Sequence, residues 1–283
     1  MKKIGIVVCS NAGTDYFDLG YPIEVMRSSL ILDGKEYKDY IDITADEFYR
    51  RASEEENLKI STAQCPVGVM TEILNKMADN GNEDIIAIVI SKEFSGIYQS
   101  VHIASEMVNN AKVHVIDSKS VSFGQLFLVQ ETIKMIKEGK NTDEIVERLL
   151  ALREKIEVLV VVDTLKFLVK NGRLSVASGL IGTLLKIKPI LRINRNGKLE
   201  TYEKIRTKKR AVERVLEIFK TETFNREVEI CLCYTNNLES VKELESKLLE
   251  IKPGAKVSYI PLSPVVGAHA GPGTLGLGYV YLD

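Results

Sequence analysis

Short runs of aliphatic residues alternate along this chain with longer amphipathic stretches, and this alternation restricts the fold more than any single motif does. Residues 4–9, 85–91 and 112–116 are short and rich in Val and Ile, which is typical of strands in the middle of a sheet. The stretches between them carry the helical period, and strands that alternate with helices predict an α/β fold on a parallel sheet. The helices expected in this part of the chain cover 45–55, 67–79, 96–109, 121–138 and 141–155.

The pattern changes beyond about residue 160. Asn196-Gly197 separates two strand-like runs, 189–194 and 198–206, and this dipeptide is a strong hairpin signal that introduces antiparallel pairing. We therefore predict two domains: residues 1–160 as a Rossmann-like parallel sheet with flanking helices, and residues 161–283 as an α+β domain with a mixed or antiparallel sheet. The strand at 156–162 is expected to end the first domain. The elements expected after the hairpin are helices 207–222 and 237–250 and strands 227–234, 256–261 and 278–282.

Charge supports the same division. Residues 1–150 hold 16 Lys and Arg against 24 Asp and Glu, whereas residues 151–283 hold 22 against 15. Such an asymmetry is expected when two parts of a chain face different ligands or partners.

Cysteine usage and the chain's apolar stretches indicate a cytoplasmic protein. None of the four cysteines belongs to a Cys-x-x-Cys pair, so we expect free core thiols in a reducing compartment. The first residues lack the apolar segment and cleavage site of a signal peptide. Residues 257–282 carry no charge, but three prolines and five glycines predict turns and short strands there, not a membrane span.

Hydroxyl-rich turns follow the strands expected in the first domain. In an open α/β sheet, ligands bind beyond the carboxyl ends of the strands, so these turns are expected to meet at one edge. Hydroxyls and free helix N–H groups together suit a small anion. Taken singly, each Ser or Thr is more often a helix cap. The turns are Ser10–Gly13, Ser61–Gln64, Phe94–Ser100 and Asp117–Gly124.

Two further residues stand out because glycines present them. His269 lies in an uncharged loop, residues 266–273, where it could donate to an anion or to a transferring phosphoryl group; the alternative is a core histidine bonded to a carbonyl. Arg173 follows a glycine turn within residues 164–212, which hold 13 Lys and Arg but only two acids. Most of that basic stretch is expected to be a solvated face. His102 and His114 form no ligand-spaced cluster, so no metal is predicted.

Several motifs are absent. Glu93 and Ile97 exclude a Gly-x-Ser-x-Gly elbow around Ser95, and neither a phosphate-binding P-loop nor Gly-x-Gly-x-x-Gly occurs. The pI of about 6.4 and the lack of interleaved aromatic residues disfavour a nucleic-acid partner.

Taken in order, the turns resemble those of the DegV family of bacterial fatty-acid-binding proteins along essentially the whole chain. The resemblance implies two α/β domains with one long-chain fatty acid buried between and within them. It also implies that the bound acid is handed to a separate ATP-dependent fatty-acid kinase, which makes acyl-phosphate for phospholipid synthesis. The matching segments are Ser10, Thr62-x-Gln64, residues 94–100, Asp117–Gly124, Asn171–Ser175, residues 187–191 and residues 267–273.

The resemblance also implies roles for single residues. Thr62 and Ser95, with Gly96, would hold the carboxylate; His269 would lie near it, and Arg173 would lie at the mouth facing the kinase. Ser10 and Ser122 are expected as supporting hydroxyls. The chain departs from the family at Cys9, where Asp is usual, and at Ala63–Pro66, where Ser-Gln-Pro-Ser is usual. The first change removes a carboxylate partner of the hydroxyl network, so it bears on head-group geometry and kinase coupling more than on tail binding.

Elementary energetics favours such a ligand independently of the family. Each buried methylene contributes about 0.8 kcal/mol, so a chain of about 16 carbons gives on the order of 12 kcal/mol before costs. Neutral hydroxyls can then hold the head group without a buried cation. The side chains that could line a tunnel, or simply form core, are Phe123, Leu126, Phe127 and Val129 and the group Leu180, Ile181, Leu184 and Leu185.

The expected function is therefore a lipid carrier that is not itself an enzyme and that needs no cofactor beyond its bound fatty acid. Two alternatives are a stand-alone phosphotransferase or hydrolase that uses Ser95 and His269, and a nucleic-acid-binding module that uses the basic stretch. The sequence does not specify chain length or saturation of the acid, oligomeric state or the identity of the kinase.

Overall fold

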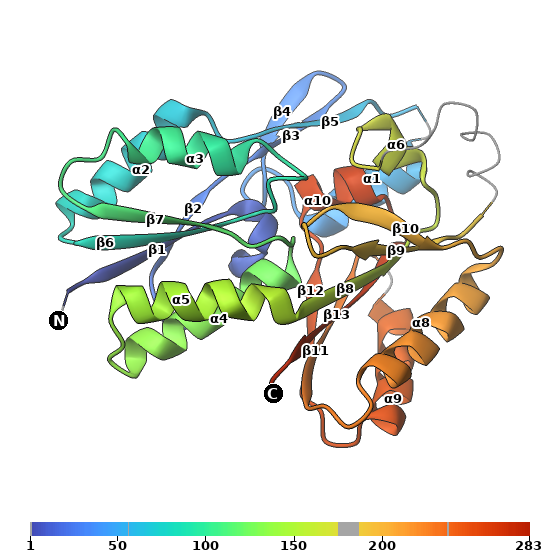
Figure 1. The fold of residues 1–283 in the computed structure, drawn as a ribbon. Helices are drawn as coiled ribbons and strands as arrows, with labels where there is room; N and C mark the ends of the chain where they lie inside the picture. Colours follow the sequence, from blue (N-terminus) through green and yellow to red (C-terminus); the bar gives the residue numbers. More distant parts are fainter. Residues whose placement is uncertain (1, 56, 175–186, 237) are drawn as a thin grey trace.

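The computed structural model of the chain is a mixed α/β structure with two principal sheets lying side by side (Figure 1). The structure describes residues 2–55, 57–174, 187–236 and 238–283. The predicted fold class is confirmed: a parallel sheet comes first along the chain and a mixed sheet second.

The first sheet is wholly parallel, and its central strand is β1 (Ile4–Cys9). Alternate residues of β1 enter different cores: Val7 packs with one layer of helices, and Ile6 and Val8 pack with the other. This period of two follows from the strand geometry. In spatial order the strands are β2 (Ile23–Met26), β1, β6 (Asp84–Val89) and β7 (Lys112–Asp117).

Four helices cover the two faces of this sheet. At the start of α5 (Thr142–Leu152), the side chains of Asn141 and Glu144 form a capping box, because each side chain bonds the other residue's backbone N–H. Thr44 accepts from the Glu47 N–H at the start of α1 (Ala45–Glu54). On one face lie α2 (Val67–Asp79) and α3 (Ile97–Ser105), and on the other α4 (Phe123–Lys137) and α5 (Thr142–Leu152), the last followed by the 3-10 turn Arg153–Lys155 (Figure 1).

The second sheet is mixed, and it corrects one prediction. The strand expected to close the first domain, β8 (Ile156–Val161), pairs antiparallel with β13 and β9 in the second sheet. The run Ile-Glu-Val-Leu-Val-Val indicates a buried strand, but it does not indicate which of the two sheets the strand joins. We therefore propose that the two domains divide near residue 155 instead of 160. The spatial order is β10 (Leu199–Glu203), β9 (Ile190–Ile193), β8, β13 (Leu275–Tyr281), β11 (Val228–Tyr234) and β12 (Val257–Pro261).

The two faces of the second sheet have different neighbours. Leu277 and Tyr279 of β13 pack with α8 (Lys208–Glu222) and α9 (Leu238–Ile251) in one core. The opposite face presents Gly276, Gly278 and Val280 toward the first sheet, where Val280 joins a core that includes residues of α4. This inner face is the one that borders the candidate site.

A three-stranded antiparallel sheet was missed by the sequence analysis. It consists of β3 (Ser29–Leu32), β4 (Lys35–Lys38) and β5 (Ile60–Ala63), in the order β4-β3-β5. Asp33 and Gly34 join β3 to β4 with positive φ at both residues, as a type I′ hairpin requires. The Asp-Gly dipeptide was therefore the available signal, but the strands around it are only four residues long.

The uncharged segment, residues 257–282, contains β12, the short helix α10 (Pro264–Ala270) and β13, so the predicted short strands are confirmed and the helix is an addition to them. His269 thus lies in the last turn of α10, and the expectation of a loop was wrong. Pro264 occupies the first helical position, where its missing N–H costs nothing. Among the helices of the described residues, none combines the length and apolar character needed to cross a bilayer.

Candidate ligand-binding site

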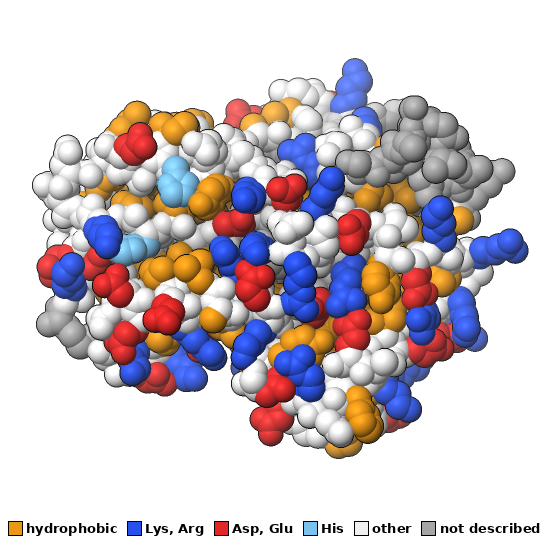
Figure 2. Space-filling model, in the orientation of Figure 1, with side chains coloured by type: hydrophobic (Ala, Val, Ile, Leu, Met, Phe, Trp, Pro, Cys, Tyr) orange, Lys and Arg blue, Asp and Glu red, His pale blue; other side chains and the backbone are white. Residues whose placement is uncertain are grey.

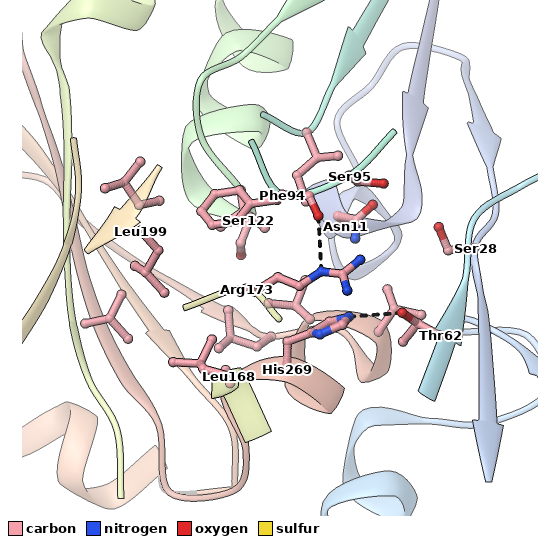
Figure 3. A pocket seen from close by; sticks show the side chains of 18 of the residues that line it. Asn11, Ser28, Thr62, Phe94, Ser95, Ser122, Leu168, Arg173, Leu199 and His269 are labelled. Carbon is pink, nitrogen blue, oxygen red and sulfur yellow. Dashed lines mark hydrogen bonds between the residues drawn. The ribbon is translucent and has the colours of Figure 1, made fainter. Parts of the chain in front are cut away.

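A cavity of about 290 Å³ lies between the two principal sheets and the small one (Figure 3). One end is polar and is lined by Asn11, Ser28, Thr62, Gln64, Ser95 and His269. The rest is mainly apolar and is lined by Val121, Val158, Val160, Val162, Ile193, Leu199 and Gly276, among others. A cavity with one polar end and a long apolar part suits an elongated amphipathic molecule.

The first sheet contributes its carboxyl edge. Asn11 follows β1, residues 94–97 follow β6, and Val121 and Ser122 follow β7; all of them line the cavity. The prediction that these turns meet at one edge is therefore confirmed for three strands. The turn that contains Thr62 is the exception, because Thr62 lies within β5 of the small antiparallel sheet.

Thr62 and His269 come together from distant parts of the chain. The Thr62 Oγ1 and the His269 Nε2 are 3.0 Å apart and share a hydrogen bond (Figure 3). The position of α10 is set by Tyr49 of α1, whose hydroxyl donates to the Leu262 carbonyl at 2.9 Å. Tyr49 also packs on Gly267, where a Cβ would come within 2.2 Å of the Tyr49 hydroxyl, so only glycine allows this approach.

The His269 ring is neutral at physiological pH. Burial, and to a smaller extent the positive charge of Arg173, lower its pKa from the ordinary 6.5 to about 4. A neutral imidazole has one donor and one acceptor nitrogen. Because Nε2 already bonds the Thr62 hydroxyl, the pair supplies a hydroxyl of fixed position to the polar end, without adding charge.

Ser95 lies in the turn before α3. Its Oγ accepts from the Ile97 N–H at 3.3 Å, which leaves the hydroxyl proton free to donate. Gly96 is exposed next to it, and a Cβ there would be 3.4 Å from the Gln64 amide oxygen. Gln64 is in turn fixed by a 2.8 Å hydrogen bond from its amide nitrogen to the Ser100 Oγ. Of the residues predicted to hold the head group, Ser95 and Gly96 therefore lie at the cavity together with Thr62 and His269.

Arg173 lies exposed at the cavity, as the prediction of a residue at the mouth requires. Its Nε donates to the Phe94 carbonyl at 3.2 Å, and its Nη1 donates to the Asn171 carbonyl at 2.6 Å. Asn171 donates from its amide to the Ala268 carbonyl of α10 at 2.9 Å. The guanidinium thus connects the turn after β6 with the helix that carries His269.

Of the two predicted supporting hydroxyls, Ser122 lines the cavity and Ser10 does not. Ser10 lies behind the cavity wall, where its Oγ accepts from the Ser28 N–H at 3.3 Å. It also lies against Asp39, a fully buried carboxyl that the sequence analysis missed. Burial raises the Asp39 pKa to about 6, while the hydroxyls of Ser10 and Ser263 and the Val265 N–H oppose that rise.

The departure at Cys9 has a local structural account. The buried Cys9 Sγ accepts from the Ile90 N–H at 3.3 Å and from the Gln125 amide at 3.1 Å. Burial raises the pKa of this thiol. The residue therefore satisfies donors between β1, β6 and α4 and does not line the cavity. All four cysteines are buried and free, as expected.

The apolar floor comes from the inner face of the second sheet. Val158 and Val160 are alternate residues of β8, Val162 directly follows that strand, and Gly276 pairs with Val160 across the ladder. The candidate tunnel residues of α4 instead belong to the core: Phe123, Leu126, Phe127 and Val129 pack in the cluster shared by both sheets. Leu180, Ile181, Leu184 and Leu185 lie outside the described residues.

The basic stretch is neutralised in part where the structure describes it. Arg192 bonds Glu157 and Glu222, and Lys208 pairs with Asp163 at 2.9 Å. Figure 2 shows blue and red side chains interspersed across this face of the molecule. The interpretation as a solvated face is therefore supported, and the surface in view carries no broad stripe of one sign.

The His269 ring bonds Thr62 rather than Ser95, and in the part of the chain that the structure describes no hydrogen bond joins Ser95 to His269. The described residues also contain no group of three or more His, Cys, Asp or Glu side chains placed to hold a metal.

Fold and cavity together define an α/β protein with a mainly apolar cavity between its sheets. The chain belongs to the DegV family, whose model, described as an uncharacterised protein family, matches residues 3–282. A DegV domain-containing protein of Clostridium acetobutylicum is 34% identical over 281 residues, covering 98% of each chain.

Solved structures agree with this assignment. The fatty acid binding DegV family protein SAG1342 of Streptococcus agalactiae superposes with a TM-score of 0.90 at 28% identity, over 100% of each chain. DegV of Bacillus subtilis, a fatty acid binding protein, gives a TM-score of 0.90 at 26% identity over 99% of this chain and 100% of that one.

Proposed function

We propose that this protein is a cytoplasmic carrier that binds one long-chain fatty acid and presents its carboxylate to a separate ATP-dependent kinase. The observation that carries the proposal is the cavity itself, which joins a polar end with neutral donors to an apolar floor. The fatty acids bound by the related S. agalactiae and B. subtilis proteins support the same ligand class.

The polar end suits a carboxylate that must later react. Ser95 and Thr62 can donate hydrogen bonds to it, and the neutral His269 keeps Thr62 in place. Because these groups carry no charge, a carboxylate oxygen keeps the electron density that it needs to attack a phosphoryl donor on the partner. The affinity then comes mainly from the buried chain.

The handover requires a feature at the mouth, and we assign it to Arg173. Its guanidinium is exposed while its Nε is held by the Phe94 carbonyl beside Ser95. A cation in this position can attract the anionic phosphates of a kinase-bound nucleotide or an acidic surface of the kinase. The carrier itself has no catalytic residue in this scheme; the kinase transfers the phosphoryl group, and the resulting acyl-phosphate enters phospholipid synthesis.

Binding and handover are tested separately. Delipidated protein is titrated with palmitate and oleate in a calorimeter, and acyl-phosphate formation is then measured with ATP and a bacterial fatty-acid kinase. We expect Arg173→Ala to lose most of the transfer while still binding palmitate, because the guanidinium is exposed at the cavity and the affinity comes mainly from the buried chain. Lys170→Ala, an exposed cation of α6 (Lys166–Lys170) outside the cavity, is the matched control. Acyl-phosphate formed by the carrier alone with ATP contradicts the proposal.

A further inference from the structure

Ser122 occupies an unusual place in the cavity. It follows β7 and precedes α4, its side chain is 3% exposed, and it lines the cavity. The next residue, Phe123, packs its ring on Gly278, and Gly278 pairs with Val158 of the apolar floor. In Figure 3 the label of Ser122 lies on the Leu199 side of Arg173, away from Thr62 and Ser28, and the preceding Val121 packs against the cluster that contains Val158 and Leu199. A hydroxyl therefore lies within the apolar part, apart from the polar end.

The hydroxyl of Ser122 is not used for helix capping. An N-cap serine ordinarily has extended backbone and accepts from the first turn of its helix, as Thr44 does in α1. Ser122 instead has φ 54° and ψ −111°, and its side chain makes no capping bond. No hydrogen bond joins its Oγ to another described residue. The residue is thus buried, and its hydroxyl has no partner among the described residues and borders the cavity.

The start of α4 adds donors beside it. The first helical bond runs from the Leu126 N–H to the Ser122 carbonyl, so the N–H groups of the three preceding residues lack a helical acceptor. Gly124 holds the turn tightly, because a Cβ there would come within 2.1 Å of the Ser120 Oγ. The N-terminal end of this 15-residue helix carries partial positive charge and favours oxygen lone pairs.

We infer that Ser122 and the first turn of α4 form a second polar subsite, and that it takes a hydroxyl group on the acyl chain of a hydroxylated long-chain fatty acid. The inference rests on the proposed function and narrows its ligand class. An unsubstituted chain leaves the Ser122 hydroxyl without water and without a partner, which is costly. A chain hydroxyl can both donate to and accept from it, whereas a methylene does neither.

The test compares stearate with its 2-, 3-, 10- and 12-hydroxy derivatives on the delipidated full chain by calorimetry. We expect one positional isomer to bind about tenfold tighter than stearate, the size expected for one buried polar group gaining its partner. Ser122→Ala and Ser122→Gly should abolish that preference and tighten stearate binding, because they remove the hydroxyl that an unsubstituted chain leaves without a partner. The glycine variant fits the positive φ and so guards against misfolding of the alanine variant.

Ser28→Ala is the matched control, because Ser28 lines the polar end and its loss should weaken every acid alike. Stearate that binds wild type as tightly as every hydroxy isomer overturns the inference while leaving the carrier function intact. A preference that survives in both Ser122 variants overturns it as well. Failure of all five acids to bind defeats the proposed function and the inference together.

Discussion

The two principal sheets contribute to the cavity in different ways. The parallel sheet offers the ends of its strands, where turns leave hydroxyls and helix N–H groups, whereas the mixed sheet offers the face of β8 and β13. Polar groups at strand ends cost little free energy, because the backbone N–H and C=O groups there are not all hydrogen-bonded to a neighbouring strand. A strand face buried against another layer carries apolar side chains. The two sheets therefore line the cavity with different kinds of side chain, because one borders it with strand ends and the other with a strand face.

This comparison predicts that substitutions in the two regions change fatty-acid affinity differently. A substitution on the face of the mixed sheet should weaken binding more for a longer acyl chain. A substitution at the edge of the parallel sheet should weaken the binding of every acid by a similar factor.

The largest effect is expected on the face. Val160→Phe fills part of the floor, since Val160 is partly exposed to the cavity opposite Gly276. Displacing about three methylenes should cost about 2.4 kcal/mol, or about sixtyfold in palmitate affinity. Decanoate should bind nearly as it does to wild type. Calorimetric titration with both acids measures this, and an equal loss for both would show that Val160 does not border the chain.

A smaller effect is expected at the edge of the cavity. Thr62→Val keeps the shape but removes the hydroxyl that bonds His269, and should weaken acids of every length by about tenfold. Ser61→Ala is the control, because Ser61 is an exposed neighbour on the same strand. The account is wrong at this residue if Thr62→Val weakens palmitate but leaves decanoate unaffected.

The smallest expected effect is a change in the pH dependence of stability. His269 has a folded pKa of about 4 against an ordinary 6.5, so the unfolded chain binds the extra proton between these values and stability rises with pH. Asp39 has a folded pKa of about 6 against 3.8, so the folded chain binds the extra proton and stability falls as pH rises. The two contributions oppose each other between about pH 4 and 6.

Single variants separate these contributions. Asp39→Asn should make stability rise more steeply with pH over this window, and His269→Gln should make it rise less or fall. Urea unfolding at pH 4.5, 5.5 and 6.5 measures both slopes. Identical slopes in wild type and both variants would show that neither group is shifted as described.

The difference between edge and face also explains what the sequence could predict. Turns such as Phe94–Ser100 and Asp117–Gly124 combine hydroxyls with a preceding aliphatic strand, so their place at a sheet edge could be inferred from the sequence. Val158, Val160 and Gly276 of the floor look like any core strand, because burial against a ligand and burial against protein select the same residues.

Other features depended on long-range packing. Strand 156–161 was assigned to the wrong sheet because its partners, β13 and β9, lie far along the chain. The contact of Thr62 with His269 spans 207 positions, and the predicted loop around His269 became a helix held by Tyr49. The sequence around His269 gives no sign of its contact with Thr62 or of the contact of its helix with Tyr49.

The most direct test of the central claim is mass spectrometry of lipids extracted from the purified, denatured protein. We predict about one long-chain fatty acid per chain, reduced in Thr62→Val and in Ser95→Ala. A protein that carries no lipid and takes up no added fatty acid in a titration would contradict the account.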